Sequence, residues 1–556
     1  MNRAPRVLGI RVAGTALVAS AAWYVPWLLR SADWATAWLS APFVLANLWI
    51  ITSTVVTLIN NWQRSVPRSH LLPGGCEPLV AVIIPTCGEP AWMVRRTLQS
   101  VLNQDWPHDR LLVVVSDDAH CERMAHMAQV LAARHPLVRI IYHEPPARED
   151  PRRQGAAKAG NLNSALELVR RTYPTVDVIE TRDADDEVGD KQFLREAVGQ
   201  LSHDSRVAFV QTVKEARVGG GDPFGNNDPL FYRGAMYARN AANAVFPCGS
   251  GLVWRITALE HIGGFPTWNL VEDLQSGVEA LRHGWRGLYL PIVGAVGQTA
   301  PEDIPNVYKQ RGTWALDTMR LLLFGRLRGL SLRQKLHFAE LGLFYGLSLA
   351  ALVLLICPVI ALAFGRYPLV TTHGSYVAHF WPFALSVEAF LAALATGHRY
   401  ETLWRARQMW VGMAPVYAKA CVLALRYGPR RKPTYRVTRK NTEAAWYWRE
   451  TLPQSVLLAA LLCAVGYGAA TSSIIERLDI GSVYWAAFSS IFLAGFIRKS
   501  WYGVSRRPRR TATSPSGAPS MHDRVIDLRD PAVPAPAVIS RDRPSDTQPL
   551  RIRQPS

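Results

Sequence analysis

Closely spaced cysteine pairs are missing from this 556-residue sequence, because none of its seven cysteines form a CxxC arrangement. Zinc sites and redox motifs usually carry such pairs, and disulfide frameworks are typical of short secreted chains. The sequence therefore indicates neither, and a reducing compartment suits its central part. A signal-peptide cleavage site is missing as well. No small-residue motif separates the apolar run 12–29 from the next one, so we expect a retained signal anchor.

Acidic residues are too few to balance the basic ones. The chain has 43 Asp and Glu against 62 Lys and Arg, which gives a net charge of +19. Such an excess can indicate nucleic-acid binding. Here, however, the arginines concentrate beside hydrophobic runs and in the C-terminal tail, as in the cytoplasmic loops of membrane proteins. We therefore expect membrane lipids, and no nucleic acid, as partners of the basic segments.

Long uncharged runs stand at both ends of the chain. A helix that crosses the hydrocarbon core needs about 20 mostly apolar residues. Six segments meet or nearly meet this length, namely 12–29, 36–60, 341–365, 374–397, 452–474 and 480–497. The positive-inside rule then places the central part, the basic segment 398–450 and both termini in the cytosol.

The sequence divides into five parts. We expect two transmembrane helices in 1–62, a catalytic domain in 63–305, interfacial helices in 306–340, four more transmembrane helices in 341–500 and a disordered tail in 501–556. Residues 306–337 and 401–428 mix Trp, Leu and Arg at helical spacing, which is typical of helices on a membrane surface. Helices packed beneath the central domain would explain the pattern equally well. The tail is rich in Pro, Ser and Arg, a composition typical of disorder.

The central part alternates short β-branched runs with helical periods. The predicted strands are Leu79–Ile84, Leu111–Val115, Arg139–Tyr142, Val176–Ile179 and Val207–Gln211, and Met93–Asn103 and Ala157–Arg171 are predicted helices. This alternation predicts an α/β domain with a largely parallel sheet covered on both faces. Ligands of such sheets bind at the carboxyl ends of the strands. Thr86–Glu89, Asp117–Asp118 and Asp183–Asp185 all follow predicted strands.

Two carboxylates flank one alanine in Asp183-Ala184-Asp185, so in extended backbone both point to one side. Hard divalent cations prefer oxygen ligands and often keep waters and substrate phosphates in their shell. The adjacent Asp186 adds a like charge that is costly without a cation. The pattern therefore favours a metal site, although a solvated Asp-rich turn would read the same.

The other candidate residues have ordinary explanations beside the functional ones. Asp117 and Asp118 could accept hydrogen bonds from a nucleoside, or form an Asx turn. Lys158 could supply a positive charge to a nucleotide, or belong to a plain loop. Glu272 and Asp273 could supply a general base, or be a solvated first helical turn favoured by the helix dipole.

Three further residues would suit a phosphate or a sugar. Arg311 could balance the charge of a departing diphosphate. Trp314 could stack on a sugar ring or anchor the chain at the membrane interface. By its chemistry alone, the segment Tyr435–Lys440 is only a basic, hydroxyl-bearing loop between two spans.

Taken in order, these motifs resemble the D, DxD, TED, QxxRW series of processive membrane glycosyltransferases, above all bacterial cellulose synthase catalytic subunits and their relatives. The matching residues are Asp117-Asp118, Asp183-x-Asp185, Val271-Glu272-Asp273 and Gln310-Arg311-x-x-Trp314. Phe246–Ser250 is similar to the FFCGS segment of that family. Tyr435-x-Val437-Thr438-x-Lys440 is similar to its FxVTxK gating loop. The likeness covers residues 75 to 440.

The resemblance implies a GT-A type glycosyltransferase domain, with a Rossmann-like mixed sheet, inserted in a polytopic helical membrane domain. It implies a UDP-sugar donor, Mg²⁺ or Mn²⁺ at Asp183 and Asp185, and Asp273 as base beside Glu272. The nucleotide-binding residues it implies are Thr86, Glu89, Asp117, Asp118, Lys158, Arg311, Thr438 and Lys440. The acceptor-binding residues it implies are Cys248, Gln310 and Trp314.

The function implied is polymerisation of a UDP-sugar, with UDP-glucose as first candidate, by an inverting and processive β-glycosyltransferase. The polysaccharide would leave across the bacterial inner membrane, with a periplasmic export partner as a further candidate. The sequence departs from the family at Cys87-Gly88, Asp186, Val271 and Thr313. Two alternatives stay open: a non-processive enzyme that transfers one sugar to a polyprenyl phosphate or lipid, and a degenerate transporter or scaffold. Thr313, where the family has a second arginine, is the best support for the latter.

Overall fold

The computed structural model describes residues 7–501, except 219–221, 223, 399, 432, 434–444 and 472–478. The predicted tail lies outside the described residues apart from its first residue, Trp501. So do the loop residues Thr438 and Lys440.

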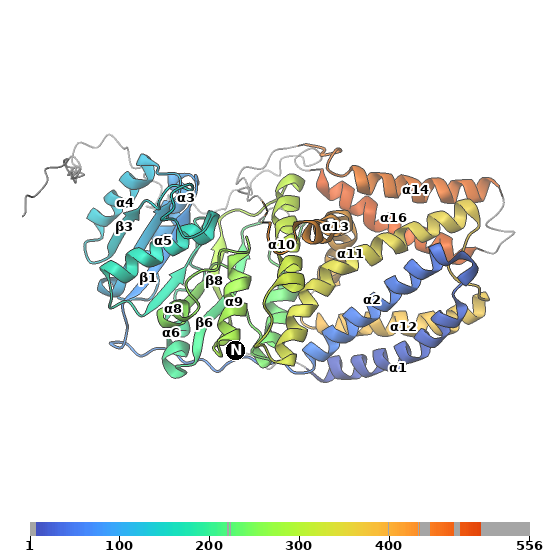
Figure 1. Cartoon of the computed structure of the whole chain (residues 1–556), viewed down its shortest axis with the longest axis horizontal. Coiled ribbons are helices and arrows are strands. Elements are labelled where there is room, and N and C mark those ends of the chain that lie inside the picture. Colours follow the sequence, from blue (N-terminus) through green and yellow to red (C-terminus); the bar gives the residue numbers. More distant parts are fainter. Residues whose placement is uncertain are drawn as a thin grey trace, which may run out of the picture. The chain divides into compact units, whose positions relative to one another are not determined.

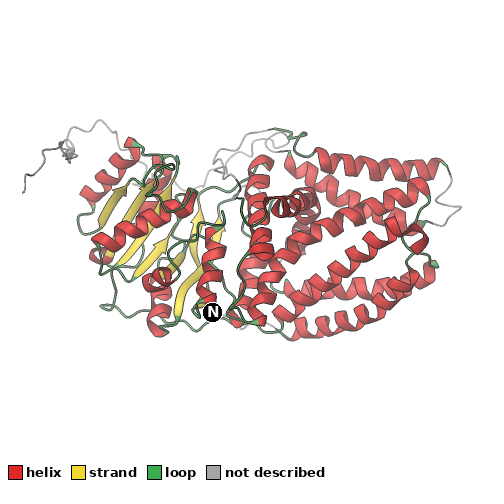
Figure 2. Ribbon diagram, viewed as in Figure 1, coloured by secondary structure: helices red, strands yellow, loops and turns green. Residues whose placement is uncertain are grey.

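An eight-stranded mixed sheet forms the centre of the α/β domain (Figure 2). Its strands are β1 Val80–Thr86, β2 Leu111–Asp117, β3 Arg139–His143, β4 Val178–Thr181, β5 Asp186–Glu187, β6 Val207–Ala216, β7 Leu252–Arg255 and β8 Arg286–Gly297. Their order is β3-β2-β1-β4-β7-β6-β8-β5. β1 to β4 are parallel, β7 is antiparallel to both of its neighbours, and β6 is parallel to β8. The five strands predicted from the sequence are all present.

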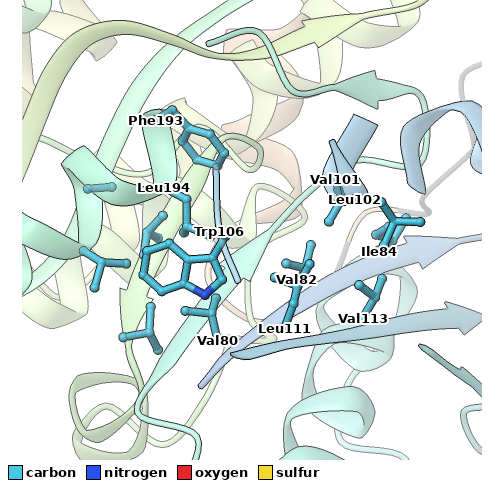
Figure 3. Close-up of a cluster of buried hydrophobic side chains, with 14 of the residues drawn as sticks. Val80, Val82, Ile84, Val101, Leu102, Trp106, Leu111, Val113, Phe193 and Leu194 are labelled. Atoms are coloured by element: carbon cyan, nitrogen blue, oxygen red, sulfur yellow. The ribbon is translucent and has the colours of Figure 1, made fainter. Parts of the chain in front are cut away.

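Both faces of the sheet are covered by helices, as expected for buried parallel strands. The helices of this domain are α3 Ala91–Leu102, α4 Glu122–Arg134, α5 Ala157–Thr172, α6 Phe193–His203, α7 Met236–Ala241, α8 Ile256–His261 and α9 Glu272–Arg282 (Figure 1). Alternate residues of β1 serve opposite faces because side chains alternate along a strand. Val80, Val82 and Ile84 pack with Trp106 and Phe193 in one core (Figure 3).

Seven helices among the described residues are long and apolar enough to cross a membrane, whereas six spans were predicted. They are α1 Leu8–Ser31, α2 Ala37–Asn61, α11 Leu332–Phe364, α12 His373–Leu394, α13 Tyr400–Tyr427, α14 Leu452–Ala470 and α16 Ile480–Ser500. The seventh is α13, which the sequence predicted to lie on the surface. Its charged residues gather at its first turns and leave only Lys419 in 408–425.

The predicted interfacial segment 306–340 is divided between two helices. α10 covers Ile304–Phe324, and α11 begins at Leu332 and continues into the long apolar stretch. Ser331 caps α11: its side chain accepts from the Gln334 amide, while the Gln334 side chain accepts from the Ser331 amide. Such a capping box starts a helix firmly, which explains why α11 begins before its apolar part.

Candidate active site

The predicted acidic residues gather at one edge of the sheet. Thr86 ends β1, Asp117 ends β2, and Asp183 lies two residues beyond β4. These three strands are parallel neighbours. Their carboxyl ends therefore open on the same side, where ligands of α/β sheets bind.

Asp183 is held between two ammonium groups. Lys158, in the first turn of α5, donates to Oδ1 of Asp183 at 2.5 Å, and Lys214, on β6, donates to Oδ2 at 2.6 Å. Lys214 also lies 2.8 Å from Oδ2 of Asp186. Burial raises the pKa of Asp183, but the two ammonium groups outweigh it and hold that pKa well below its ordinary value.

The second acidic pair reaches the same place from α9. Lys158 Nζ lies 3.7 Å from Oε1 of Glu272 and donates to the carbonyl of Gly249 at 3.3 Å. A Cβ placed on Gly249 would lie 3.0 Å from Lys158 Nζ and 3.2 Å from Oδ2 of Asp273. Asp183, Lys158, Gly249, Glu272 and Asp273 therefore line one small space, although they are far apart in the sequence.

The acidic pair holds its protons more strongly than usual. Burial raises the pKa of Glu272 to about 7 against the opposing effect of Lys158, and the neighbouring Asp273 adds to the rise. Burial likewise raises the pKa of Asp273, which Lys158 opposes. Because the two carboxyl groups influence each other, their titration belongs to the pair.

The segment Phe246–Ser250 is fixed to the Asp183 turn by a buried glutamine. Gln211 Oε1 accepts from the amide of Cys248 at 2.6 Å, and its Nε2 donates to the carbonyl of Ser250 at 3.1 Å. Ser250 Oγ accepts from the amide of Asp183 at 3.1 Å. Burial raises the pKa of the Cys248 thiol, and the charge of Asp273 adds to this. Cys248, predicted to bind the acceptor, thus lies beside the acidic pair.

Asp117 is saturated by fixed donors. Its oxygens accept from Thr86 Oγ1, the amides of Ala119 and Cys121, and the Tyr142 hydroxyl, at 2.8 to 3.1 Å. A carboxylate has about four acceptor positions. These contacts favour a role in shaping the loop after β2, and direct contact with a nucleotide stays a prediction.

Asp118 forms a buried ion pair that the sequence did not reveal. Arg153 donates to both of its oxygens, at 2.9 and 2.8 Å, and the two side chains are only 2% and 3% exposed. Glu89, another predicted nucleotide ligand, accepts from the amide of Cys87 at 2.6 Å and so stays close to its own turn.

The QRGTW motif lies on α10. Arg311 donates to the carbonyls of Phe224 and Gly225, at 2.8 and 3.0 Å. Trp314 is 43% exposed, and Thr313 Oγ1 donates to the carbonyl of Lys309 within the helix. Among the described residues, Arg311, Gln310 and Trp314 make no contact with the Lys158–Asp183 group, so their binding roles stay predictions.

Two basic residues and Gln211 were missed by the sequence reasoning. Lys214 lies on the part of β6 beyond the predicted strand Val207–Gln211, so a longer predicted strand would have drawn attention to it. Arg153 lies in the long connection between β3 and α5, which carries no motif. Gln211 ended a predicted strand but gave no chemical signal. Only the fold shows what these three side chains contact.

The comparisons with known proteins agree with this geometry. Residues 77–316 match the family described as glycosyltransferase like family 2. Cellulose synthase 1 catalytic subunit, UDP-forming, of Komagataeibacter xylinus is 29% identical over 339 residues, 58% of this chain and 42% of that protein. Cellulose synthase 2 of Novacetimonas hansenii is 27% identical over 473 residues, 79% of this chain and 27% of that protein.

Residues 77–316 thus form a glycosyltransferase family 2 domain that is similar to the catalytic subunits of cellulose synthases. Its mixed sheet is of the GT-A type, so the resemblance read from the motifs and the fold that it implied are confirmed. Among solved structures, a mannosyltransferase from Pyrobaculum calidifontis in complex with GDP-Man and Mn²⁺ aligns with a TM-score of 0.49 and 23% identity, covering 69% of this chain and 99% of that one. The chain spans less than half of the length of either cellulose synthase named above.

The donor set fits a divalent cation only with help from other ligands. No group of three or more His, Cys, Asp or Glu side chains within the described ranges forms a metal cage. Asp183 already attracts two cationic groups, and its oxygens are of the hard type that Mg²⁺ and Mn²⁺ prefer. A cation that takes its remaining ligands from water and a diphosphate would therefore suit Asp183, and its binding by Asp185 stays a prediction.

Proposed function

We propose that this glycosyltransferase is a processive inverting enzyme that polymerises a UDP-sugar, with UDP-glucose as first candidate. The observation that carries the proposal is the convergence of Lys158, Asp183, Glu272 and Asp273 around Gly249. The similarity to the UDP-forming cellulose synthase catalytic subunit of Komagataeibacter xylinus supports the donor class.

In the proposed reaction, Asp273 accepts the proton of an acceptor hydroxyl while that oxygen bonds to the anomeric carbon of the donor. The bond between that carbon and the diphosphate oxygen breaks, UDP leaves with the bonding electrons, and the configuration inverts. A buried carboxylate with a raised pKa supports this role, because it binds a proton more strongly than an exposed one.

Lys158 and Lys214 would receive the negative charge of the diphosphate. Both pKa values lie above the ordinary one because nearby carboxylates outweigh the effect of burial, so both side chains stay charged at neutral pH. Fixed positive charge near a leaving group lowers the barrier by balancing the charge that develops there. Mg²⁺ or Mn²⁺ held by Asp183 and Asp185 would add a Lewis acid on the diphosphate.

The apolar helices support a membrane location for the reaction. In this proposal six of the seven candidate helices cross the bacterial inner membrane and α13 lies on its cytosolic surface, and the polysaccharide leaves through the helical domain. Cytosolic termini, contact of Thr438, Lys440 and Arg311 with the nucleotide, and binding of the acceptor by Cys248, Gln310 and Trp314 are parts of the same proposal.

The test is to incubate purified membranes with each radiolabelled UDP-sugar in turn and to measure product length on a gel. A long product that a β-linkage-specific hydrolase digests is expected from UDP-glucose. A product one sugar longer than its lipid acceptor would favour the non-processive alternative, and no UDP release from any donor would favour a scaffold.

Metal removal gives a second test of the same proposal. Excess chelator should abolish synthesis, and added Mg²⁺ or Mn²⁺ should restore it, because the diphosphate would lack its Lewis acid. Full activity in chelator would contradict the assignment of Asp183 and Asp185 as metal ligands.

A further inference from the structure

A buried ion pair lies on α10 one turn beyond Trp314. Arg320 Nη1 donates to Oδ1 of Asp317 at 3.0 Å, and the side chains are 1% and 0% exposed. Neither residue belongs to the motifs singled out in the sequence. Burying two charges is costly unless their remaining hydrogen bonds are well satisfied. The other contacts of the pair therefore indicate what it does.

Asp317 holds the segment that precedes the acidic pair. Its Oδ2 accepts from the amide of Leu270 at 2.5 Å, and its carbonyl accepts from the Asn269 side chain at 3.0 Å. The amide of Asn269 in turn donates to Oε1 of Gln275 on α9, at 3.1 Å. Residues 269 and 270 are thus fixed from α10 and from α9, two residues before Glu272.

Arg320 reaches a third segment, the chain that follows α13. Its Nη2 donates to the carbonyl of Arg431 at 2.9 Å, and its Nε donates to that of Gly428 at 3.4 Å. The guanidinium carbon lies 4.7 Å from the centre of the Trp268 ring. Trp268 Nε1 donates to the carbonyl of Pro429 at 2.8 Å. Arg320 and Trp268 therefore join residues 428–431 to the segment before Glu272.

A simple stabilising role does not account for this arrangement. An (i, i+3) pair on a helix surface contributes little to stability, whereas this pair is buried and its remaining atoms bond to two other segments. Those segments lie about 160 positions apart in the sequence, at 268–270 and 428–431. The guanidinium suits this task because its planar fork can donate in several fixed directions at once.

We propose that Asp317 and Arg320 are positioning residues that set the place of Asp273, by fixing residues 268–270 against α10 and against the chain after α13. The proposal rests on the proposed transferase function, since Asp273 is the base of that reaction. We call the contacts of Asp317, Arg320 and Trp268 with residues 268–270 and 428–431 the tie. Disrupting the tie should lower the rate of transfer without weakening UDP binding, because neither Asp317 nor Arg320 contacts the Lys158–Asp183 group among the described residues.

The most conservative variant that disrupts the tie is Trp268→Phe, which removes the hydrogen bond to Pro429 and keeps an aromatic ring beside Arg320. Arg320→Gln removes the ion pair and both contacts to 428–431. Trp285→Phe is the matched control, because the Trp285 indole also donates one hydrogen bond, to His261 at 3.0 Å, elsewhere in the same domain. All three are compared as full-length protein in detergent.

Two readouts separate positioning from mere stability. The first is kcat per UDP-binding site, which corrects for unfolded protein. It should fall by about 10- to 100-fold in Arg320→Gln, less in Trp268→Phe and not in Trp285→Phe, with the Kd for UDP unchanged. The second is hydrogen exchange of peptides that contain 268–271 and 428–431. Both should exchange faster in the two tie variants, and neither in the control.

An unchanged kcat per site in a folded Trp268→Phe and Arg320→Gln protein would overturn the proposal. So would faster exchange in only one of the two segments. If Arg320→Gln fails to fold, Trp268→Phe still decides. If the wild-type protein releases no UDP from any donor, the proposed transferase function fails, whereas the exchange experiment still reports whether the two segments are tied.

Discussion

Two groups of carboxylates at the same edge of the sheet differ in what neutralises them. Asp117 and Asp118, at the end of β2, are bound by backbone amides, two hydroxyls and the buried guanidinium of Arg153. Asp183 and Glu272 instead lie within reach of lysine ammonium groups that are about a quarter exposed. The carboxylates of the first group accept hydrogen bonds from donors whose positions are fixed. The second is neutralised by point charges on long, flexible side chains.

This difference separates structural from exchangeable charge. A donor fixed in the backbone cannot leave when a ligand arrives, so the contacts of Asp117 and Asp118 define the loop. An ammonium group on a flexible stem can exchange one anionic partner for another. In the proposed reaction, Lys158 and Lys214 would therefore transfer from Asp183 to the incoming diphosphate. We call Asp117 and Asp118 with their donors the structural half of the site. The chemical half consists of Lys158, Asp183, Lys214, Gly249, Glu272 and Asp273. The following predictions test the contrast between the two halves.

The largest effect is expected in the chemical half, from Asp273→Asn. The amide keeps the shape of the side chain but cannot accept the proton, and general bases contribute about 10²- to 10⁴-fold to rates. Polymer synthesis should fall by about that factor. Binding of UDP, measured by calorimetry, should stay close to wild type. Synthesis at the wild-type rate would show that another group is the base.

In the structural half, Asp118→Asn should act on stability rather than on chemistry. It leaves the Arg153 guanidinium buried without its charged partner, which typically costs about 3 to 5 kcal/mol. Thermal unfolding in detergent should show a clearly lower midpoint. The control is Asp150→Asn, since Arg152, the partner of Asp150, is 81% exposed, and its midpoint should not move. Weaker UDP binding at an unchanged midpoint would instead support direct contact of Asp118 with the nucleotide.

Gly249→Ala should damage the chemical half by filling the space between its residues. The new Cβ would lie 3.0 Å from Lys158 Nζ and 3.2 Å from Asp273 Oδ2, at a backbone φ of +84°. A misplacement of about 1 Å can lower a rate by about 100-fold. Gly263→Ala is the matched control, because its φ is +81° and no atom lies within 4 Å of its new Cβ. Equal losses in both variants would trace the effect to backbone strain.

The strands that lead to the structural half were largely predictable from the sequence, whereas one strand elsewhere in the sheet was not. The strands β1 and β2 begin with runs of apolar residues, Val80–Ile84 and Leu111–Val115, and their predicted ends fall within two residues of the observed ones. β8 was not predicted, because Gly287, Pro291 and Gly294 interrupt its pattern and such residues are rare in strands. Pairing with β6 holds these residues in a strand, although their own sequence does not favour one.

The chemistry of the site was readable only in part. Asp183 and the Glu272–Asp273 pair carry motif spacing, and the structure brings them to one place. Their cationic partner Lys214 does not follow from spacing, because it is a single lysine on a strand. Arg153, the partner of Asp118, is one of three arginines in the loop between β3 and α5. What a charged side chain contacts depends on which strands lie side by side in the sheet. The place of β6 between β7 and β8 follows from the packing of the whole domain, so the sequence around Lys214 does not predict it.

The smallest effect concerns pH, and it gives opposite signs for activity and stability. The pKa of Glu272 is raised to about 7, mainly by burial, which Lys158 opposes and Asp273 reinforces. A carboxyl group with a raised pKa favours the folded state at pH values below its ordinary pKa, and this contribution is lost as the pH rises through about 7.

Activity changes in the other direction, because the acidic pair must lose a proton before Asp273 can act as base. We expect kcat/KM to be about tenfold lower at pH 6 than at pH 8, and Glu272→Gln to remove this limb near pH 7. A limb that stays near pH 7 in Glu272→Gln would assign the titration to another group, whereas its loss would place that proton in the chemical half of the site.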